Sequence, residues 1–238
     1  MELRRFYVRP EDIEGDVITV SGNEYRHMTG VLRFKVGYQT IVCDNTGIDY
    51  LAIVEHIDKS AATLRIIERK TNNAELPYTL RLCCGLIKGE KLEIEVQKAV
   101  EIGVHQIQPF NSRYTAEQDV RQDRLERIVL EACKQCGRAV LPRVMPIARF
   151  EDIFESNAHY YMAYEKEDKH LLRDVVAKPH SQETVALVIG SEGGFSPEEV
   201  QLALSAGATT FSLGKRILRA ETAAIVALGT FGALTEEL

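Results

Sequence analysis

The sequence predicts a small β-rich domain over residues 1–70 and an α/β domain with a mostly parallel sheet over residues 71–238. Three observations support this division. The first part contains short β-rich runs separated by turns, without helical periodicity, which favours a small barrel or sandwich. A polar segment that ends in proline, residues 70–77, is typical of a linker. After it, apolar runs alternate with amphipathic helices, which is the pattern of an α/β domain.

In the first domain, alternation and turn residues predict four strands, over residues 16–20, 38–43, 50–57 and 62–68. The tripeptide Ser21–Gly22–Asn23 is expected to form a turn after the first strand. Polar segments at 44–47 and 58–60 separate the later strands. This spacing resembles that of successive hairpins.

In the second domain, apolar runs predict strands over residues 80–88, 106–109, 160–164, 185–189 and 210–213. Apolar residues at helical spacing predict helices over 90–102 and 121–136, and a third that begins near Glu221. Gly103 stands where a glycine often ends a helix, and Gly137 and Pro142 close the second helix.

Composition excludes several classes of protein. With 238 residues, 45% hydrophobic and 27% charged, the chain can bury a substantial core. The first residues lack the apolar stretch of a signal peptide and no apolar run could span a bilayer, so we expect a cytoplasmic protein without membrane attachment. The net charge of −6 does not favour a polyanion partner, so nucleic-acid contacts would depend on local basic clusters. Residues 132–150 and 200–220 contain basic but no acidic residues, and a shorter basic cluster lies around residues 26–35.

The five cysteines do not predict a disulfide framework or a metal centre. Cys133 and Cys136 form a C-x-x-C pair on a predicted helix, but no second Cys/His pair has the spacing of a zinc site. We therefore expect no metal and assign no redox function to this pair.

The first candidate ligand loop is VALVIGSEGGFSPEEV, residues 185–200. Its apolar run predicts a strand buried on both faces, and Ser196, Pro197 and Glu199 predict a capped helix start. Ligands of open α/β sheets bind beyond the carboxyl ends of strands, where this loop lies. The glycine spacing fits neither a dinucleotide fingerprint nor a P-loop, and Glu192 would repel phosphate. A ligand with a ribose and a base fits better, although a tight turn without ligand would also produce this pattern.

The second candidate loop is FSLGKRILRAETAAIVALGTF, residues 211–231. A strand leads into Gly214 and a basic loop, and then into a helix without charge from Ala223 to Phe231. Ile217 and Leu218 could form an apolar wall while Arg219 faces a polar group. Such a helix is more often part of a core or of a subunit contact than of a site.

Together, IGSEGGFSPEE (189–199) and LGKRILRAETA (213–223) closely resemble motifs of the SPOUT-class RNA methyltransferases. The resemblance is greatest to the RsmE group, which methylates N3 of a uridine in 16S ribosomal RNA. RRFYV (4–8), HMTGVLRFKVG (27–37) and EACKQCGR (131–138) resemble further segments of that family in the expected order. Ser191 replaces the proline usual in the family, and residues 111–114 depart from its pattern, so no function is transferred to that loop.

The resemblance implies a PUA-like N-terminal barrel, a trefoil-knotted α/β domain, a homodimer and the cofactor S-adenosylmethionine. It further implies that the two motifs bind this cofactor, through Ile189, Gly190, Ser191, Glu192, Gly193, Gly194, Leu213, Gly214, Ile217, Leu218 and Arg219. The implied substrate is 16S rRNA, within the assembled small ribosomal subunit.

For catalysis, the proton on uridine N3 must leave before or during methyl transfer. Arg219 is the candidate that stabilises the uridine anion, and Glu192 and Glu221 are candidate bases if burial makes their carboxylates more basic. Glu221 could instead be structural, either as an ion-pair partner of Arg216 or Arg219 or as the acid in the first turn of its helix. RNA contacts are expected from Arg4, Arg5, Arg26, Arg33 and Lys35 on the barrel and from Arg138 near the active site.

Three other functions are alternatives to a uridine-N3 methyltransferase. A doubly wound nucleotide-binding enzyme would need a glycine spacing that is absent. A non-catalytic RNA-binding protein would have no need of glycines at 190, 193, 194 and 214. A 2′-O-ribose RNA methyltransferase shares the α/β architecture, and only the full-length resemblance favours N3 of uridine over it.

Overall fold

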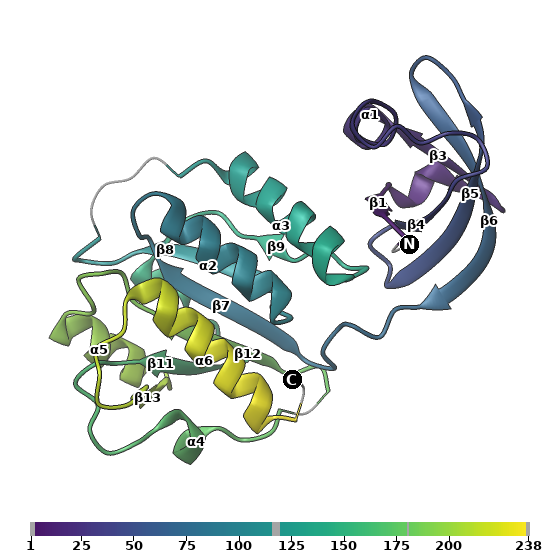
Figure 1. Ribbon diagram of the computed structural model, residues 1–238. Helices are drawn as coiled ribbons and strands as arrows, with labels where there is room; N and C mark the ends of the chain where they lie inside the picture. The colour runs from purple at the N-terminus through teal and green to yellow at the C-terminus, as the bar shows by residue number, and fades with distance from the viewer. Residues whose placement is uncertain (1–2, 116–119, 180, 237–238) are drawn as a thin grey trace. The chain divides into compact units, whose positions relative to one another are not determined.

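The computed structural model describes residues 3–115, 120–179 and 181–236 (Figure 1). By their internal contacts these residues form two compact units. Unit 1 comprises residues up to 75 together with 133–141, and unit 2 comprises 76–132 and 142 onward. A division by contacts does not test independent folding, so the domains 1–70 and 71–238 stay a prediction. Among the described residues, none of the helices has the length and apolar character needed to cross a bilayer.

Unit 1 contains one six-stranded sheet in the order β1-β4-β5-β6-β3-β2. All neighbouring strands are antiparallel except β1 and β4, which are parallel. The elements in chain order are β1 (Arg5–Tyr7), η1 (Pro10–Asp12), β2 (Ile13–Glu14), β3 (Val17–Ser21), α1 (Gly22–Arg26), η2 (His27–Val31), β4 (Gln39–Cys43), β5 (Ile48–Ile57) and β6 (Ala61–Thr71). The four predicted strands are present, but residues 22–23 begin a helix instead of forming the predicted turn.

Unit 1 has a single core, which every long strand of its sheet helps to fill. Phe6 and Val42 come from β1 and β4, and alternate residues of β3, β5 and β6 face them. Met28, fully buried in η2, contributes to the same core. The sequence predicted either a small barrel or a sandwich. One sheet around one core corresponds to the barrel, since a sandwich would need two stacked sheets.

Residues 133–141, which include the end of the helix over Gln122–Cys136, belong to unit 1. They form ion pairs and hydrogen bonds with other residues of this unit. Lys134 forms a nearly buried ion pair with Glu24, with Nζ 2.7 Å from Oε1. Arg138, 2% exposed, pairs with Glu75, and its carbonyl oxygen accepts a hydrogen bond from the Tyr7 hydroxyl at 2.5 Å. Lys134 and Arg138 belong to the basic cluster at residues 132–150, and their acidic partners come from distant parts of the chain.

Unit 2 contains a sheet in the order β10-β8-β7-β12-β11-β13, with β9 paired to β8, and all its pairings are parallel. Its elements are β7 (Thr79–Gly85), α2 (Glu90–Glu101), β8 (Gln106–Asn111), α3 (Gln122–Cys136), β9 (Arg143–Val144), β10 (Ala148–Arg149), η3 (Phe150–Ile153), β11 (Ala158–Ala163), α4 (Leu172–Val175), β12 (Thr184–Ile189), α5 (Pro197–Ser205), β13 (Thr209–Phe211) and α6 (Ala220–Leu234). The predicted α/β class and parallel sheet are confirmed.

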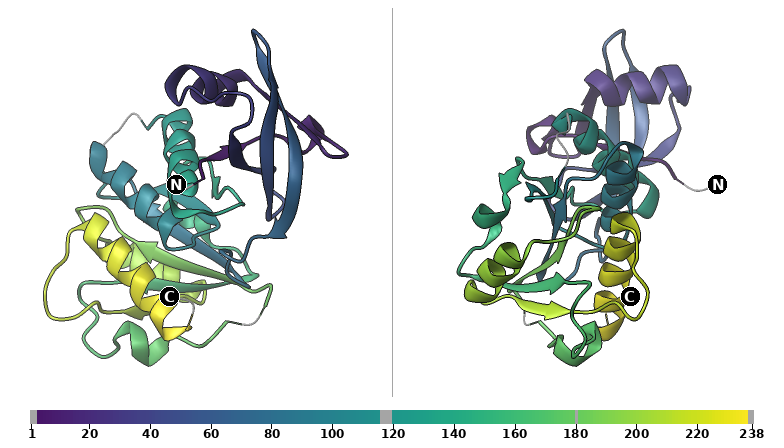
Figure 2. Two further views of the ribbon diagram at one scale, coloured as in Figure 1. Left: turned by 45° about the vertical axis from the view of Figure 1, so that its right-hand side comes forward. Right: turned by 90° about the vertical axis from the view of Figure 1, so that its left-hand side faces the viewer.

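Helices cover both faces of this sheet (Figure 2). On one face, α2 and α6 lie side by side over the central strands (Figure 1). On the other face, α5 and η3 pack through Val200, Ala203 and Phe150 against strand residues such as Cys83 and Val188. The central strand β12 is buried along Val185–Ile189, as a strand covered on both faces must be.

Candidate functional site

A cavity of about 680 Å³ lies at the carboxyl edge of the parallel sheet in unit 2. Three loops form it, each following one strand: the loops after β11, β12 and β13. This position and size are typical of ligand sites in open α/β sheets. Its lining residues are Lys91, Ala163, Tyr164, Glu165, Ile189, Gly190, Ser191, Glu192, Gly193, Gly194, Phe195, Ser212, Leu213, Gly214, Lys215, Arg216, Ile217, Leu218, Arg219, Ala220 and Ala223.

The loop after β12 is held by close packing that only glycine permits at two positions. A Cβ atom on Gly193 would lie 2.5 Å from Cβ of Tyr114, far inside van der Waals contact. Gly194 has φ of +67°, a left-handed conformation, and a Cβ there would lie 3.3 Å from both carboxylate oxygens of Glu165. At these two positions the loop therefore presents backbone rather than side chain to the cavity.

The end of this loop is fixed by the predicted capping box of α5. The Glu199 amide donates to the Ser196 hydroxyl at 3.2 Å, and the Ser196 amide donates to the Glu199 carboxylate at 2.8 Å. The same carboxylate also accepts from the Arg113 amide at 2.8 Å. Through these bonds Glu199 links the loop after β8 to the start of α5, which directly follows the glycine loop.

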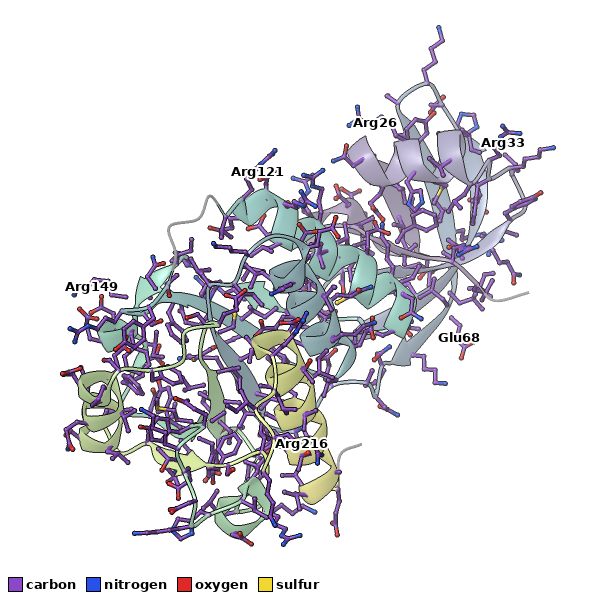
Figure 3. All side chains as sticks on the ribbon, turned by 60° about the vertical axis from the view of Figure 1, so that its left-hand side comes forward. Arg26, Arg33, Glu68, Arg121, Arg149 and Arg216 are labelled. Atoms are coloured by element: carbon purple, nitrogen blue, oxygen red, sulfur yellow. The ribbon has the colours of Figure 1, made fainter. Side chains whose placement is uncertain are left out.

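The loop after β13 supplies apolar and cationic side chains to the cavity. Ile217 is 88% exposed, an unusual state for an isoleucine unless a ligand or partner covers it. Lys215, Arg216 and Arg219 are exposed, and Arg219 occupies the N-cap of α6 in an extended conformation. Figure 3 labels Arg216 on the segment that leads to α6. This wall offers apolar contact and positive charge together.

Glu192 in the cavity is ion-paired and its pKa is lowered, whereas its prediction as a base required burial to raise the pKa. Its carboxylate accepts from Lys91 Nζ at 3.1 Å. Partial burial raises the pKa of Glu192, but the bond from Lys91 and nearby backbone amides outweigh this effect and lower it below the ordinary range. A carboxylate with a lowered pKa is a poor proton acceptor.

Glu221 lies in the first turn of α6, next to the cavity residue Ala220. Among the described residues it forms no ion pair with Arg216 or Arg219, and its buried Oε2 has no hydrogen-bond partner. Of the two structural alternatives for Glu221, the ion pair with Arg216 or Arg219 is absent from the described residues, whereas the position in the first turn of its helix is present.

All eleven residues predicted for the cofactor line this one cavity, although they come from two motifs that are separated in the chain. The prediction missed the loop after β11, Ala163–Glu165, and Lys91 at the start of α2. Glu165 carries no glycine or motif signal. Only the strand order, which places β11 between β12 and β13, brings its loop to the cavity.

The basic residues predicted to bind RNA fall into two groups. Arg4, Arg26, Arg33 and Lys35 are exposed on unit 1, and Figure 3 labels Arg26 and Arg33. Arg33 has φ of +55°, which is uncommon for a residue other than glycine. By contrast, Arg5 is held by Asp49 and Arg138 by Glu75, and both side chains are largely buried. Ion pairing of this kind is a structural use of those two arginines.

The described residues contain no group of histidine, cysteine and acidic side chains that could hold a metal ion. All five cysteines are free thiols, and Cys133 is buried. Burial raises the pKa of Cys133 to about 12, so this thiol is unreactive at neutral pH.

Comparisons with known proteins match both parts of the chain. A model for an RNA methyltransferase domain matches residues 74–232, and a model for an RNA methyltransferase PUA domain matches residues 20–67. Ribosomal RNA small subunit methyltransferase E of Bacillus subtilis (strain 168) is 30% identical, over 94% of this chain and 93% of that protein. The protein of the same name from Rickettsia conorii is also 30% identical, over 96% and 94%. The crystal structure of ribosomal RNA small subunit methyltransferase E from Neisseria gonorrhoeae, bound to S-adenosyl methionine, has a TM-score of 0.88 and 30% identity over 98% of both chains.

Proposed function

Since the chain belongs to the RNA methyltransferase family that includes ribosomal RNA small subunit methyltransferase E, we propose that it methylates N3 of a uridine in 16S rRNA with S-adenosylmethionine as donor. Its class as an S-adenosylmethionine-dependent rRNA methyltransferase follows from these relatives. The choice of uridine N3 rests on the full-length resemblance to the RsmE group. The observation that supports the proposal most is the cavity in which both motifs meet.

The residues of the cavity fit this cofactor. The hydroxyl oxygen of Ser191 is buried without a hydrogen-bond partner among the described residues, so a polar ligand atom could satisfy it. Ile189, Leu213 and Leu218 offer apolar walls for an adenine, and the glycine loop offers backbone groups. Glu165 would hold the ribose or the ammonium group. The trefoil knot implied by the resemblance would be formed by these same loops.

Catalysis places specific demands on the side chains of this chain. The bound cofactor supplies an electrophilic methyl group on a sulfonium. Arg219, exposed and without an ion-pair partner among the described residues, is the group we propose to stabilise negative charge on the uracil ring. Glu221 is preferred to Glu192 as the proton acceptor, because Glu192 is paired with Lys91 and has a lowered pKa.

The RNA is proposed to contact the exposed basic residues of unit 1: Arg4, Arg26, Arg33 and Lys35. Phosphate contacts of this kind position RNA and weaken steeply with salt. Because the chain carries a net charge of −6, these local contacts must act against the overall charge. We propose the assembled small subunit in the cytoplasm as substrate, since a folded particle can present several phosphates to one patch. Salt-independent binding to the subunit would contradict this account.

We also propose that the chain acts as a homodimer through α6. The helix is uncharged from Ala223 to Phe231, and its outer residues Val226 and Leu234 remain 38% and 40% exposed. An apolar helix face left open in this way is typical of a subunit interface. Light scattering after size exclusion tests this directly, and a monomer at micromolar concentration would refute it.

The deciding experiment incubates the pure protein with labelled S-adenosylmethionine and small ribosomal subunits that lack the modification. The RNA is then digested and the labelled nucleoside identified. 3-Methyluridine is the expected product. A 2′-O-methyl nucleoside would retain the enzyme class and refute the proposed atom. Absence of label, with no thermal stabilisation by the cofactor, would favour the non-catalytic RNA-binding alternative.

A further inference from the structure

The segment that follows the start of η2 in unit 1, residues 31–38, exposes three large apolar side chains. Val31 is 70% exposed, Val36 is 60% exposed and Tyr38 is 43% exposed. Single apolar residues are ordinary on a protein surface, but several within so short a segment are typical of a surface that a partner covers. The phosphate contacts proposed above make no use of them.

The ring of Tyr38 is supported by aromatic contacts that lead to the core of unit 1. Its centroid lies 5.5 Å from that of Phe34, with an angle of 61° between the ring planes. Phe34 lies edge-on against the fully buried Phe6, again with 5.5 Å between the centroids. Edge-to-face contacts at these distances are favourable. Tyr38 is therefore an exposed ring on a fixed base, and a partner that packs on it loses little free energy in ordering it.

The backbone around Tyr38 is fixed by hydrogen bonds to β5 and within a turn. The Gly37 amide donates to the Val54 carbonyl at 2.8 Å, and the Val54 amide donates to the Tyr38 carbonyl at 2.9 Å. The Tyr38 amide donates to the Lys35 carbonyl at 3.1 Å, which closes a turn with Val36 and Gly37 at its centre. Lys35 and Tyr38 therefore lie at the two ends of one turn.

Arg33 and Lys35 give this surface positive charge. Both are exposed, and neither forms an ion pair among the described residues (Figure 3 labels Arg33). Residues 31–38 contain no acidic residue. Glu24, the nearest acid before the segment, is paired with Lys134, and Asp44, the nearest acid after it, is buried. Both cations are thus available to an anionic partner.

Arg33 also has a strained backbone, with φ of +55°. The amides on either side of it are bonded to η2: the Leu32 amide donates to the His27 carbonyl, and the Phe34 amide to the Met28 carbonyl, each at 3.0 Å. Strained conformations of residues other than glycine persist where the surrounding structure imposes them, and they are concentrated at functional sites. The strain here coincides with the exposed charge.

A partner with flat apolar surfaces and regularly spaced negative charges matches this combination. A single strand of RNA has both, because its unpaired bases expose their faces, whereas a duplex hides these faces within its stack. We propose that residues 31–38 bind an unpaired stretch of the RNA substrate, with one base stacked on Tyr38 and phosphates on Arg33 and Lys35. This proposal rests on the proposed function, since it names the form of RNA that unit 1 binds.

The test uses the full-length protein and the variants Tyr38→Leu, Tyr38→Phe and Ile67→Ala. Leucine keeps apolar contact with Phe34 but lacks a flat face, and phenylalanine keeps the ring. Ile67 on β6 is 46% exposed and lies outside the segment, so Ile67→Ala is the matched control for loss of an exposed apolar side chain. Fluorescence anisotropy measures binding to a labelled oligouridylate of about eight nucleotides, to an RNA duplex of the same length and to small ribosomal subunits, at about 50–200 mM salt.

Wild type is expected to bind the oligouridylate more tightly than the duplex. Tyr38→Leu should weaken binding to the oligouridylate and to the subunits by about 5-fold to 150-fold, because stacking of one base on an aromatic ring contributes that much. The slope of log affinity against log salt should stay the same in this variant, since no phosphate contact is lost. Tyr38→Phe and Ile67→Ala should bind like wild type.

Two further variants, Arg33→Gln and Lys35→Gln, test the same surface without altering the aromatic contacts. Each should reduce the magnitude of the salt slope for the oligouridylate by about 0.7, the value for one phosphate contact on a single strand. An unchanged slope in both variants would contradict the proposal, even if Tyr38→Leu proved too unstable to measure.

Wild-type affinity in folded Tyr38→Leu, or a duplex bound as tightly as the single strand, would overturn the inference. A loss in Tyr38→Leu that appears with subunits but not with the oligouridylate would also overturn it and would indicate a protein partner. Methyl transfer to the subunits is measured alongside. Transfer by wild type, together with normal RNA binding by Tyr38→Leu, refutes the inference alone. Stacking on Tyr38 without transfer by wild type refutes the proposed function alone.

Discussion

Substitution of Gly193 by alanine tests whether backbone clearance shapes the cavity. The added Cβ would lie 2.5 Å from Cβ of Tyr114 and 3.2 Å from its carbonyl oxygen. Ordinary contacts of this type are about 3.5–4.0 Å, so the loop after β12 must move by about 1 Å. Overpacking of this kind costs about 1–3 kcal/mol. Because 1.4 kcal/mol is a factor of ten, we expect cofactor affinity to fall by about 5-fold to 150-fold.

Calorimetric titration of the protein with S-adenosylmethionine measures this loss. Gly30→Ala is the matched control, since a Cβ at that position meets no atom within 4 Å and the backbone is not left-handed. Adding Tyr114→Gly to Gly193→Ala should recover part of the affinity, because the nearest clashing atom is then absent. Wild-type affinity in Gly193→Ala would refute the reasoning, as would a double variant no better than the single one.

Three further substitutions have defined outcomes. Arg219→Ala should lower kcat about 100-fold to 1000-fold and leave the melting temperature unchanged, since this residue is exposed and its proposed role is to stabilise charge on the uracil ring. Full activity would remove Arg219 from the mechanism. Ser196→Ala removes the cap of α5 at a cost of about 1 kcal/mol, which should lower the melting temperature by about 2–4 °C in a scan; an unchanged midpoint would show that the cap contributes nothing. Glu192→Gln should change kcat less than tenfold. The pH–rate profile should gain or lose no limb above pH 5, because the lowered pKa keeps the Glu192 carboxylate ionised throughout that range. Loss of all activity would instead identify Glu192 as the base.

Local patterns in the sequence were sufficient for most elements and for locating the two motifs that line the cavity. The capping box at Ser196 and Glu199 and the buried run at 185–189 depend only on nearby residues, and the structure contains both. The turn predicted at residues 21–23 was wrong, because Gly22 starts a short helix that continues into η2. Glycine and asparagine there indicated a change of direction, but the helix that follows also begins in such a sequence.

Features that depend on long-range packing were not predictable from local patterns. Arg138 appears in the sequence as part of an unopposed basic cluster, yet its partner Glu75 lies 63 positions away in the chain. Glu95 interrupts an apolar helix face and gives no signal of its own until α6 covers it. The contribution of Glu165 depends on strand order, which periodicity does not specify. Each case requires knowledge of which distant segment lies opposite.

The two loops of the cavity set different limits on redesign of the enzyme. At the glycines 190, 193 and 194, added side chains would meet Phe195, Tyr114 or Glu165, so a change of donor specificity cannot be introduced there without rebuilding neighbouring residues. Along residues 215–219, the side chains are largely exposed, and Ile217 is free to vary in size. A library aimed at bulkier sulfonium donors should therefore diversify the second loop and leave the first intact. The cavity thus has one wall that resists engineering and one wall that permits it.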